Sequence, residues 1–134
     1  MSDWTPQHSK ELFGIDLWGS NYFNIGSNGN VIVTPEGSDG PAIDLHSLVS
    51  DLQARGIRLP ILLRFSDIVK SRINLINECF STAIQEYEYQ GQYQGVYPIK
   101  VNQQKHLVSE IVKQGQIHNL GLECGSKPEL LITL

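Results

Sequence analysis

The feature that most constrains the fold is an alternation of element types over residues 59–134. Short apolar runs take turns with stretches in which apolar residues recur every three or four positions, which is the spacing of an amphipathic helix. A chain that alternates in this way forms a parallel sheet covered by helices, the α/β class. The expected order is a strand at 59–65, a helix from Ser66 or Asp67, a strand at 96–102, a helix at about 104–114 and a strand at 119–125.

The C-terminal segment predicts one more helix. Ser126-Lys127-Pro128-Glu129 is a capping box, in which the Ser hydroxyl and the Glu carboxylate each accept a hydrogen bond from a free backbone N–H. Pro128 suits the first turn, where its missing N–H costs nothing. The sequence stops at Leu134, about one turn into this helix. Two or three parallel strands do not close a sheet, so we expect a truncated chain.

Residues 1–58 read as a separate lead segment. Residues 1 to about 15 are polar and are expected to be irregular and loosely held. Two short strands are predicted at 21–25 and 30–34, and the Asn28-Gly29 step between them accepts positive φ and marks a hairpin. The turn residues of 35–41 predict a loop.

A short helix is expected to follow this loop. Asp44 is placed to cap it, and Gly56 to end it. Its apolar residues share one face, and they are Leu45, Leu48, Val49 and Leu52.

Composition excludes several classes of function. The net charge is −4 and the ten basic residues are scattered, whereas nucleic-acid binding needs clustered Lys and Arg. No apolar run approaches the ~20 residues that span a membrane, and the N-terminus lacks the pattern of a secretory signal. Neither the two cysteines nor the four histidines have metal-ligand spacing. We therefore expect a cytoplasmic protein with reduced thiols.

Lys100 is the candidate catalytic residue. Along the predicted 96–102 strand, Tyr97, Ile99 and Val101 point to one face, while Pro98, Lys100 and Asn102 point to the other. If the first face packs under helices, Lys100 points to the interior of the sheet near the strand's C-terminal end. Desolvation there would lower the pKa of its amine, as covalent catalysis by lysine requires. The alternative is a strand-end lysine that extends its ammonium into solvent.

Several segments resemble a known family. The lysine segment Val96-Tyr97-Pro98-Ile99-Lys100-Val101-Asn102-Gln103-Gln104 is similar to the cofactor-lysine segment of biosynthetic arginine decarboxylases. These belong to the alanine-racemase-like, barrel class of pyridoxal-phosphate enzymes. The resemblance runs from about Gly14 to Leu134, through Trp18-Gly19-Ser20-Asn21-Tyr22-Phe23, Leu59-Pro60-Ile61-Leu62-Leu63-Arg64-Phe65, Tyr87-Glu88-Tyr89-Gln90-Gly91-Gln92-Tyr93-Gln94-Gly95 and Gly121-Leu122-Glu123-Cys124-Gly125-Ser126-Lys127-Pro128-Glu129-Leu130.

The resemblance implies a fold and an activity. Residues 59–134 would be the first βα units of a pyridoxal-phosphate-binding (β/α)8 TIM-type barrel, incomplete here because such a barrel takes ~250 residues. Lys100 would hold pyridoxal 5′-phosphate as a Schiff base, and L-arginine would be converted to agmatine and CO₂ for polyamine biosynthesis. The family also implies magnesium and a homo-oligomer, but we find no cluster of carboxylates that would bind the metal.

Glu123 is the second candidate cofactor-binding residue. In the 119–125 strand it points with Gly121 and Gly125, opposite Leu120, Leu122 and Cys124. If the leucines face the helices, Glu123 faces the interior near Lys100, where the family comparison places an acidic residue. The alternative is a structural carboxylate that balances Arg64 or Lys100. Asn102, Cys124 and Ser126 are expected to be turn, core and cap residues.

Other interpretations keep part of this scheme. A related barrel decarboxylase would act on diaminopimelate, ornithine or carboxynorspermidine, and the sequence contains no residue that we assign to substrate specificity. A non-catalytic truncated relative would bind a partner, although it would have no need to retain Lys100. A stand-alone α/β binding module is a third alternative, and it requires the capped C-terminal helix to be superfluous.

Overall fold

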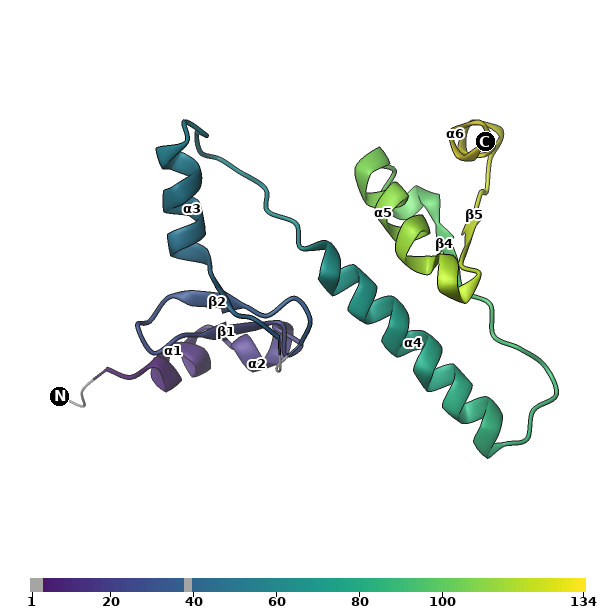
Figure 1. The fold of residues 1–134 in the computed structure, drawn as a ribbon, viewed down its shortest axis with the longest axis horizontal. Coiled ribbons are helices and arrows are strands. Elements are labelled where there is room, and N and C mark those ends of the chain that lie inside the picture. Colours follow the sequence, from purple (N-terminus) through teal and green to yellow (C-terminus); the bar gives the residue numbers. More distant parts are fainter. Residues whose placement is uncertain (1–3, 38–39) are drawn as a thin grey trace. The chain divides into compact units, whose positions relative to one another are not determined.

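The computed structural model describes residues 4–37 and 40–134 (Figure 1). The chain divides into two compact units, Met1–Ile68 and Val69–Leu134, and the division falls in the first turn of helix α4. Ser38 and Asp39 of the predicted 35–41 loop, and the first three residues of the chain, lie outside the described residues. Within the described ranges, no helix has the length and apolar character needed to cross a membrane.

The N-terminal unit begins with two short helices, α1 (Pro6–Leu12) and α2 (Ile15–Trp18). The prediction of an irregular, loosely held segment is therefore wrong for residues 6–15. A capping box explains α1, because Thr5 Oγ1 accepts the His8 N–H at 3.3 Å and His8 Nδ1 accepts the Thr5 N–H at 3.3 Å. Ile15 then anchors α2, since only 2% of it is exposed.

The predicted hairpin is confirmed. Strands β1 (Phe23–Ile25) and β2 (Val31–Val33) pair antiparallel, with Phe23 opposite Val33. Gly29 takes the positive φ of +86° that its place in the turn requires, and the Trp4 ring lies where a side chain at Gly29 would go. The unpredicted strand β3 (Ile43–Asp44) adds to β2 and is only two residues long. Val33, fully buried, lies at the centre of this unit's core.

Helix α3 (Leu45–Ala54) matches the prediction in its limits and its capping residue. Asp44 Oδ1 accepts the Ser47 N–H at 3.0 Å. Gly56 ends the helix with φ +87°, and Ile57 donates its N–H to the Leu52 carbonyl at 3.1 Å.

The predicted buried strand at 59–65 is wrong. These residues form an irregular connection, in which Leu59 is 56% exposed and Leu62 is 72% exposed. A strand needs a neighbour that pairs with its backbone. No strand of the described chain pairs with this segment. Its apolar sequence is therefore not sufficient to make it a strand.

The long helix α4 (Ser66–Glu86) is confirmed. Its predicted apolar face is only partly covered, because Ile73 is buried while Ile76 and Phe80 are each 47% exposed. Phe80 stacks on Tyr93 with a centroid separation of 3.9 Å and an interplanar angle of 4°. This contact fixes the connection between α4 and the next strand.

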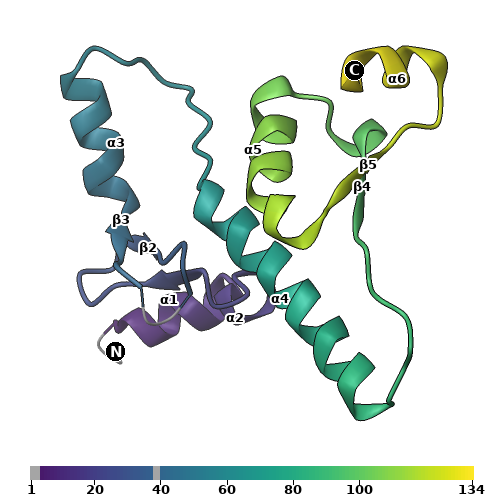
Figure 2. The same cartoon turned by 45° about the vertical axis from the view of Figure 1, so that its right-hand side comes forward.

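A βαβ unit positions the candidate site. Strands β4 (Val96–Pro98) and β5 (Gly121–Glu123) pair in parallel, as predicted, and α5 (Lys105–Gly115) and the short turn η2 (Gln116–His118) connect them. Figure 2 shows the two strands side by side with α5 next to them. Gly115 allows close packing, since a Cβ there would lie 2.6 Å from the Leu120 Cβ. The parallel α/β prediction therefore holds for this unit.

Helix α6 (Lys127–Thr133) starts at the predicted cap. Ser126 Oγ accepts the Glu129 N–H at 3.4 Å. The Glu129 carboxylate accepts from the Gly125 N–H at 2.6 Å, whereas a full capping box would use the Ser126 N–H. The predicted hydrogen bond of the Glu129 carboxylate is therefore made by the N–H of the residue before the expected donor.

Candidate functional site

Lys100 lies on a turn and not on a strand. β4 ends at Pro98, and residues Ile99–Val101 form one turn of 3₁₀ helix, η1. The predicted alternation over residues 96–102 is therefore wrong beyond Pro98. Successive side chains of a 3₁₀ helix are about 120° apart and do not alternate. Ile99 is accordingly fully buried, while Lys100 is exposed and Val101 is 69% exposed.

Two hydrogen bonds hold the C-terminal side of this turn. The Tyr97 hydroxyl donates to the Asn102 carbonyl at 3.3 Å and so spans the whole of η1. The Asn102 side-chain oxygen accepts the Gln104 N–H at 3.1 Å, which gives Asn102 the turn role expected for it. The two hydrogen bonds therefore restrain the backbone on the C-terminal side of Lys100.

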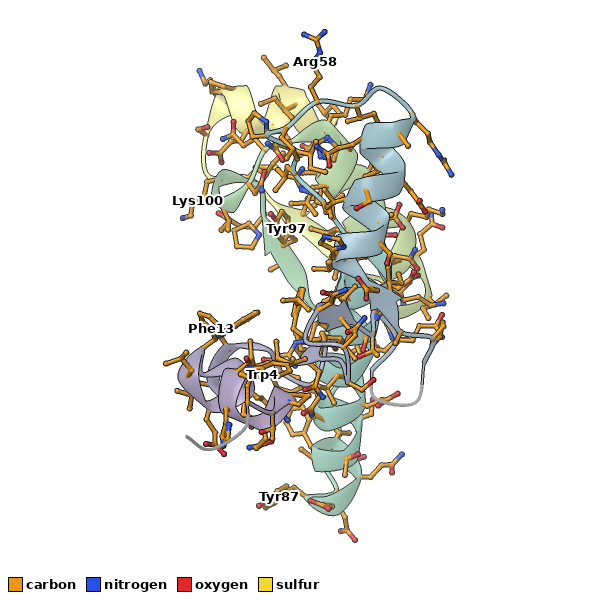
Figure 3. The ribbon with its side chains drawn as sticks, turned by 90° about the vertical axis from the view of Figure 1, so that its left-hand side faces the viewer. Trp4, Phe13, Arg58, Tyr87, Tyr97 and Lys100 are labelled. Carbon is orange, nitrogen blue, oxygen red and sulfur yellow. The ribbon has the colours of Figure 1, made fainter. Side chains whose placement is uncertain are left out.

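The Lys100 amine has no partner within the described ranges, since no hydrogen bond or ion pair is found on it. Figure 3 shows its side chain reaching out from the ribbon, with Tyr97 nearby on β4. The expected interior position is not found, because the parallel sheet beside the lysine has two strands in the part of the chain that the structure describes. In this structure the side chain of Lys100 therefore extends into solvent, as in the alternative considered from the sequence, although it does so from a turn and not from a strand end.

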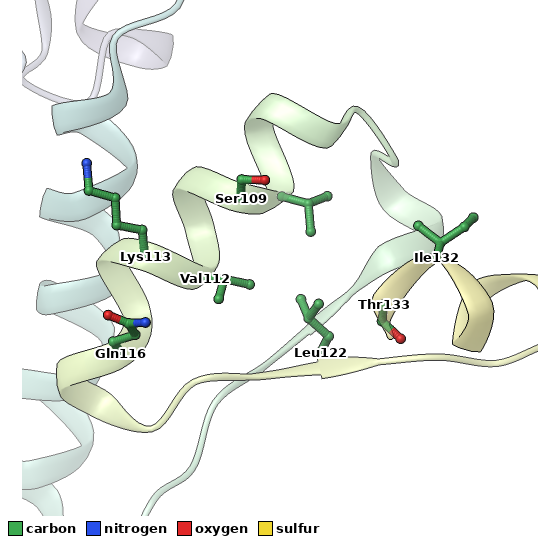
Figure 4. A pocket seen from close by; sticks show the side chains of 8 residues that line it. Ser109, Val112, Lys113, Gln116, Leu122, Ile132 and Thr133 are labelled. Atoms are coloured by element: carbon green, nitrogen blue, oxygen red, sulfur yellow. The ribbon is translucent and has the colours of Figure 1, made fainter.

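Glu123 lies on the face of β5 opposite that of Leu122. Its neighbour Leu122 lines a hollow of about 360 Å³, together with Val112 of α5 and Ile132 of α6 (Figure 4). Leu120 packs on Gly115 at the end of α5. Because successive side chains of a strand point to opposite faces, Glu123 lies on the other face of β5. Glu123 thus lies opposite the leucines, as the alternation predicts, and its position in a barrel interior stays a prediction because the described parallel sheet has two strands.

The Glu123 carboxylate is also unpaired. A Cβ at Gly125 would lie 3.5 Å from Glu123 Oε1 and 3.5 Å from Glu129 Oε2, so both carboxylates lie next to this glycine. Glu129 is engaged by the Gly125 N–H. Among the described residues, Glu123 has neither a hydrogen bond nor an ion pair. The alternative in which it balances Lys100 as an ion pair is not seen.

Lys100 and Glu123 share one edge of the sheet. Glu123 is the last residue of β5 and lies opposite Pro98, the last residue of β4. Lys100 follows two residues later. The carboxyl ends of parallel strands are where α/β proteins carry their binding groups. The topology therefore brings the two predicted site residues to the same edge.

The remaining polar candidates have structural roles. Ser126 caps α6 as expected, and Cys124 Sγ lies 3.2 Å from the Thr133 hydroxyl of the same helix. Both cysteines are free thiols. In the part of the chain that the structure describes, no group of three or more His, Cys, Asp or Glu side chains could hold a metal ion.

Sequence reasoning missed the role of Tyr97. Its hydroxyl bond to Asn102 depends on the turn at η1, whereas a strand over 96–102 would carry Asn102 out of reach. No signal in the sequence separates this tyrosine from an ordinary strand aromatic.

Proteins similar to this chain include biosynthetic arginine decarboxylases of two organisms. The biosynthetic arginine decarboxylase of Thermosynechococcus vestitus is 53% identical over 133 residues, and that of Gloeobacter violaceus is 54% identical over 134 residues. These alignments cover 99% and 100% of this chain. The chain is a relative of the biosynthetic arginine decarboxylases.

The fold agrees with that of a solved arginine decarboxylase. The crystal structure of the biosynthetic arginine decarboxylase from Campylobacter jejuni superposes with a TM-score of 0.78 at 42% identity, and the match covers 90% of this chain. The chain spans about a fifth of the length of these relatives, 21% of each of the two sequences and 20% of the solved chain. No protein-family model matches the chain.

Proposed function

We propose that this chain forms part of a pyridoxal 5′-phosphate-dependent enzyme that converts L-arginine to agmatine and CO₂, a step of polyamine biosynthesis. The observation that carries the proposal is the position of Lys100 at the carboxyl edge of β4 and β5, the edge at which Glu123 also lies. The names of the relatives at 53% and 54% identity support the choice of arginine as substrate.

The residues at this edge fit the cofactor. An aldehyde requires a primary amine that can approach it, and Lys100 is exposed on a turn whose ends are held. When bound, the cofactor supplies a pyridinium ring that takes up the electron pair left at the α-carbon as CO₂ departs. Lys100 would hold it covalently, and the turn would fix where the lysine nitrogen lies.

Glu123 is proposed to lie beside the bound cofactor. Its carboxylate is on the face of β5 opposite Leu122 and has no partner among the described residues. A negative charge at this position would attract a positively charged group of the cofactor or substrate. This role accounts for a carboxylate left unpaired at a strand end, which a structural ion pair does not.

The barrel is part of the same proposal. β4 and β5 would be adjacent strands of a (β/α)8 barrel, with α4, α5 and α6 on its outer side. The partly exposed apolar residues on α4 and α6 support this, since Ile76 is 47% and Leu131 is 76% exposed in this chain. A homo-oligomer and a magnesium requirement stay expectations from the family resemblance.

The test uses the full-length gene product. After incubation with pyridoxal 5′-phosphate and reduction with borohydride, peptide mass spectrometry should find the cofactor on Lys100. Lys100→Ala should lose both this label and CO₂ release from L-arginine. Lys105→Ala is the matched control, because Lys105 is an exposed lysine five residues further on, at the start of α5.

The outcomes separate the alternatives. Label on Lys100 with CO₂ release from arginine supports the proposal. CO₂ release that is faster from ornithine, diaminopimelate or carboxynorspermidine than from arginine would overturn arginine as the substrate. It would leave the cofactor role of Lys100 in place. An unlabelled Lys100 in an active enzyme would overturn the cofactor role.

A further inference from the structure

The Lys100 turn is held at three places. On its N-terminal side, β4 is paired with β5. In the middle, Ile99 is fully buried. On its C-terminal side, the Tyr97 hydroxyl donates to the Asn102 carbonyl. Only the third of these is a bond that reaches across the lysine, from the residue three before it to the residue two after it.

The Tyr97 ring is itself well placed to act as a fixed support. Tyr97 lies opposite Leu122 in the parallel register, and Leu122 lines the hollow shared with α5 and α6. Neighbours in register point to the same face, so the Tyr97 ring is on the helix side of the sheet. It is half-buried there. A tyrosine ring has few rotatable bonds, so its hydroxyl holds the Asn102 carbonyl at little entropic cost.

We infer that Tyr97 is a positioning residue for Lys100, acting through its hydrogen bond to the Asn102 carbonyl. This inference rests on the proposed function, because it concerns how the amine is presented to the cofactor. With the bond in place, the backbone on either side of Lys100 is fixed, and the lysine approaches the cofactor from one direction. Without it, the Asn102 carbonyl is released and the turn can change shape.

The test compares Tyr97→Phe with the wild-type full-length gene product. Phenylalanine keeps the ring and its packing, and removes only the hydroxyl. Tyr93→Phe is the matched control, because Tyr93 is stacked on Phe80 nearby and its hydroxyl makes no hydrogen bond to the described residues. Thermal unfolding of all three proteins checks that they are folded.

Two measurements report on the position of Lys100 without using turnover. The first is the rate at which pyridoxal 5′-phosphate forms its borohydride-reducible adduct on Lys100. The second is the ellipticity of the bound cofactor divided by its absorbance. That ratio depends on how the cofactor is oriented and not on how much is bound, so a loss of stability alone would not change it.

Tyr97→Phe should slow adduct formation about three- to tenfold, the effect of losing one net hydrogen bond of ordinary strength, and should lower the ellipticity ratio. Tyr93→Phe should change neither. If Tyr97→Phe leaves both values at the wild-type level, or if both variants change them equally, the inference is wrong while the proposed function stands. If wild-type protein forms no adduct on Lys100, the proposed function fails and the inference fails with it.

Discussion

Asp44 accepts a hydrogen bond of 2.8 Å from the side-chain amide of Asn30. The same carboxylate accepts from the Asn28 amide at 3.0 Å and from the Ser47 N–H at 3.0 Å. One side chain therefore joins the turn of the β1–β2 hairpin to the first turn of α3. The Ser47 N–H, followed by the amides of Asn30 and Asn28, holds the pKa of Asp44 well below its usual range.

Asp44→Ala should loosen both elements at once. The variant removes the cap of α3 and leaves the Asn28 and Asn30 amides without their acceptor. Hydrogen exchange followed by mass spectrometry should show faster exchange in peptides covering the hairpin turn and the start of α3. Asp51→Ala, on the exposed side of the same helix, is the control and should leave exchange in the hairpin unchanged. Unaltered exchange in the Asp44 variant would contradict the role of this network.

The stability of the N-terminal unit should depend on the charge of Asp44. Its pKa is lowered on folding, so its contribution is fully present above the ordinary aspartate pKa of about 3.9 and is lost as the pH falls below that value. Trp4 and Trp18, the two tryptophans of the chain, both lie in this unit. Urea unfolding of the chain followed by their fluorescence should show a difference between wild type and Asp44→Asn at pH 6 that narrows at pH 3. An equal difference at both pH values would contradict this prediction.

Ile99 and Val101 flank Lys100 and should respond differently to truncation. Ile99 is fully buried, so Ile99→Ala should lower the free energy of unfolding by about 2–5 kcal/mol. Val101 is 69% exposed, and Val101→Ala should change it by no more than about 0.5 kcal/mol. Urea unfolding with circular dichroism measures both. Equal effects would mean that the turn at η1 does not bury Ile99.

Glu123→Gln should weaken catalysis without unfolding the protein. The substitution keeps the shape of the side chain and removes its charge, so kcat/KM for arginine in the full-length gene product should fall by about tenfold, equivalent to ~1.4 kcal/mol. The absorbance spectrum of the bound cofactor should change as well. Glu78→Gln, at an exposed position of α4, is the control and should change neither. If Glu123→Gln leaves the spectrum and kcat/KM as in wild type, Glu123 has a structural role only.

The 134-residue chain expressed alone should release no CO₂ from arginine, even with pyridoxal 5′-phosphate added. Its described parallel sheet has two strands, and Lys100 is exposed beside them. Water would therefore reach the reacting groups. The cofactor would be held only by the residues at the carboxyl edge of these two strands. Detection of agmatine by mass spectrometry would show that these elements suffice.

Local sequence determined the elements whose signals act within a few residues. The Asn28-Gly29 step predicts the hairpin, Asp44 and Gly56 predict both ends of α3, and Ser126 predicts the start of α6. Each of these features is a hydrogen bond or a backbone angle that neighbouring residues set by themselves. The parallel pairing of β4 with β5 was predicted from a longer pattern, because a helix between two apolar runs is the usual connection of parallel strands.

Tertiary structure decided which apolar segments pair as strands and where individual polar side chains lie. The 59–65 run has strand character but no partner strand in the described chain, and pairing cannot be read from one segment. The end of β4 at Pro98 placed Lys100 on a turn, where a period-two pattern no longer applies. The contacts of Tyr97 with Asn102 and of Asp44 with Asn30 also came only from the fold, because a hydrogen bond across a turn or between elements depends on where the backbone carries each group.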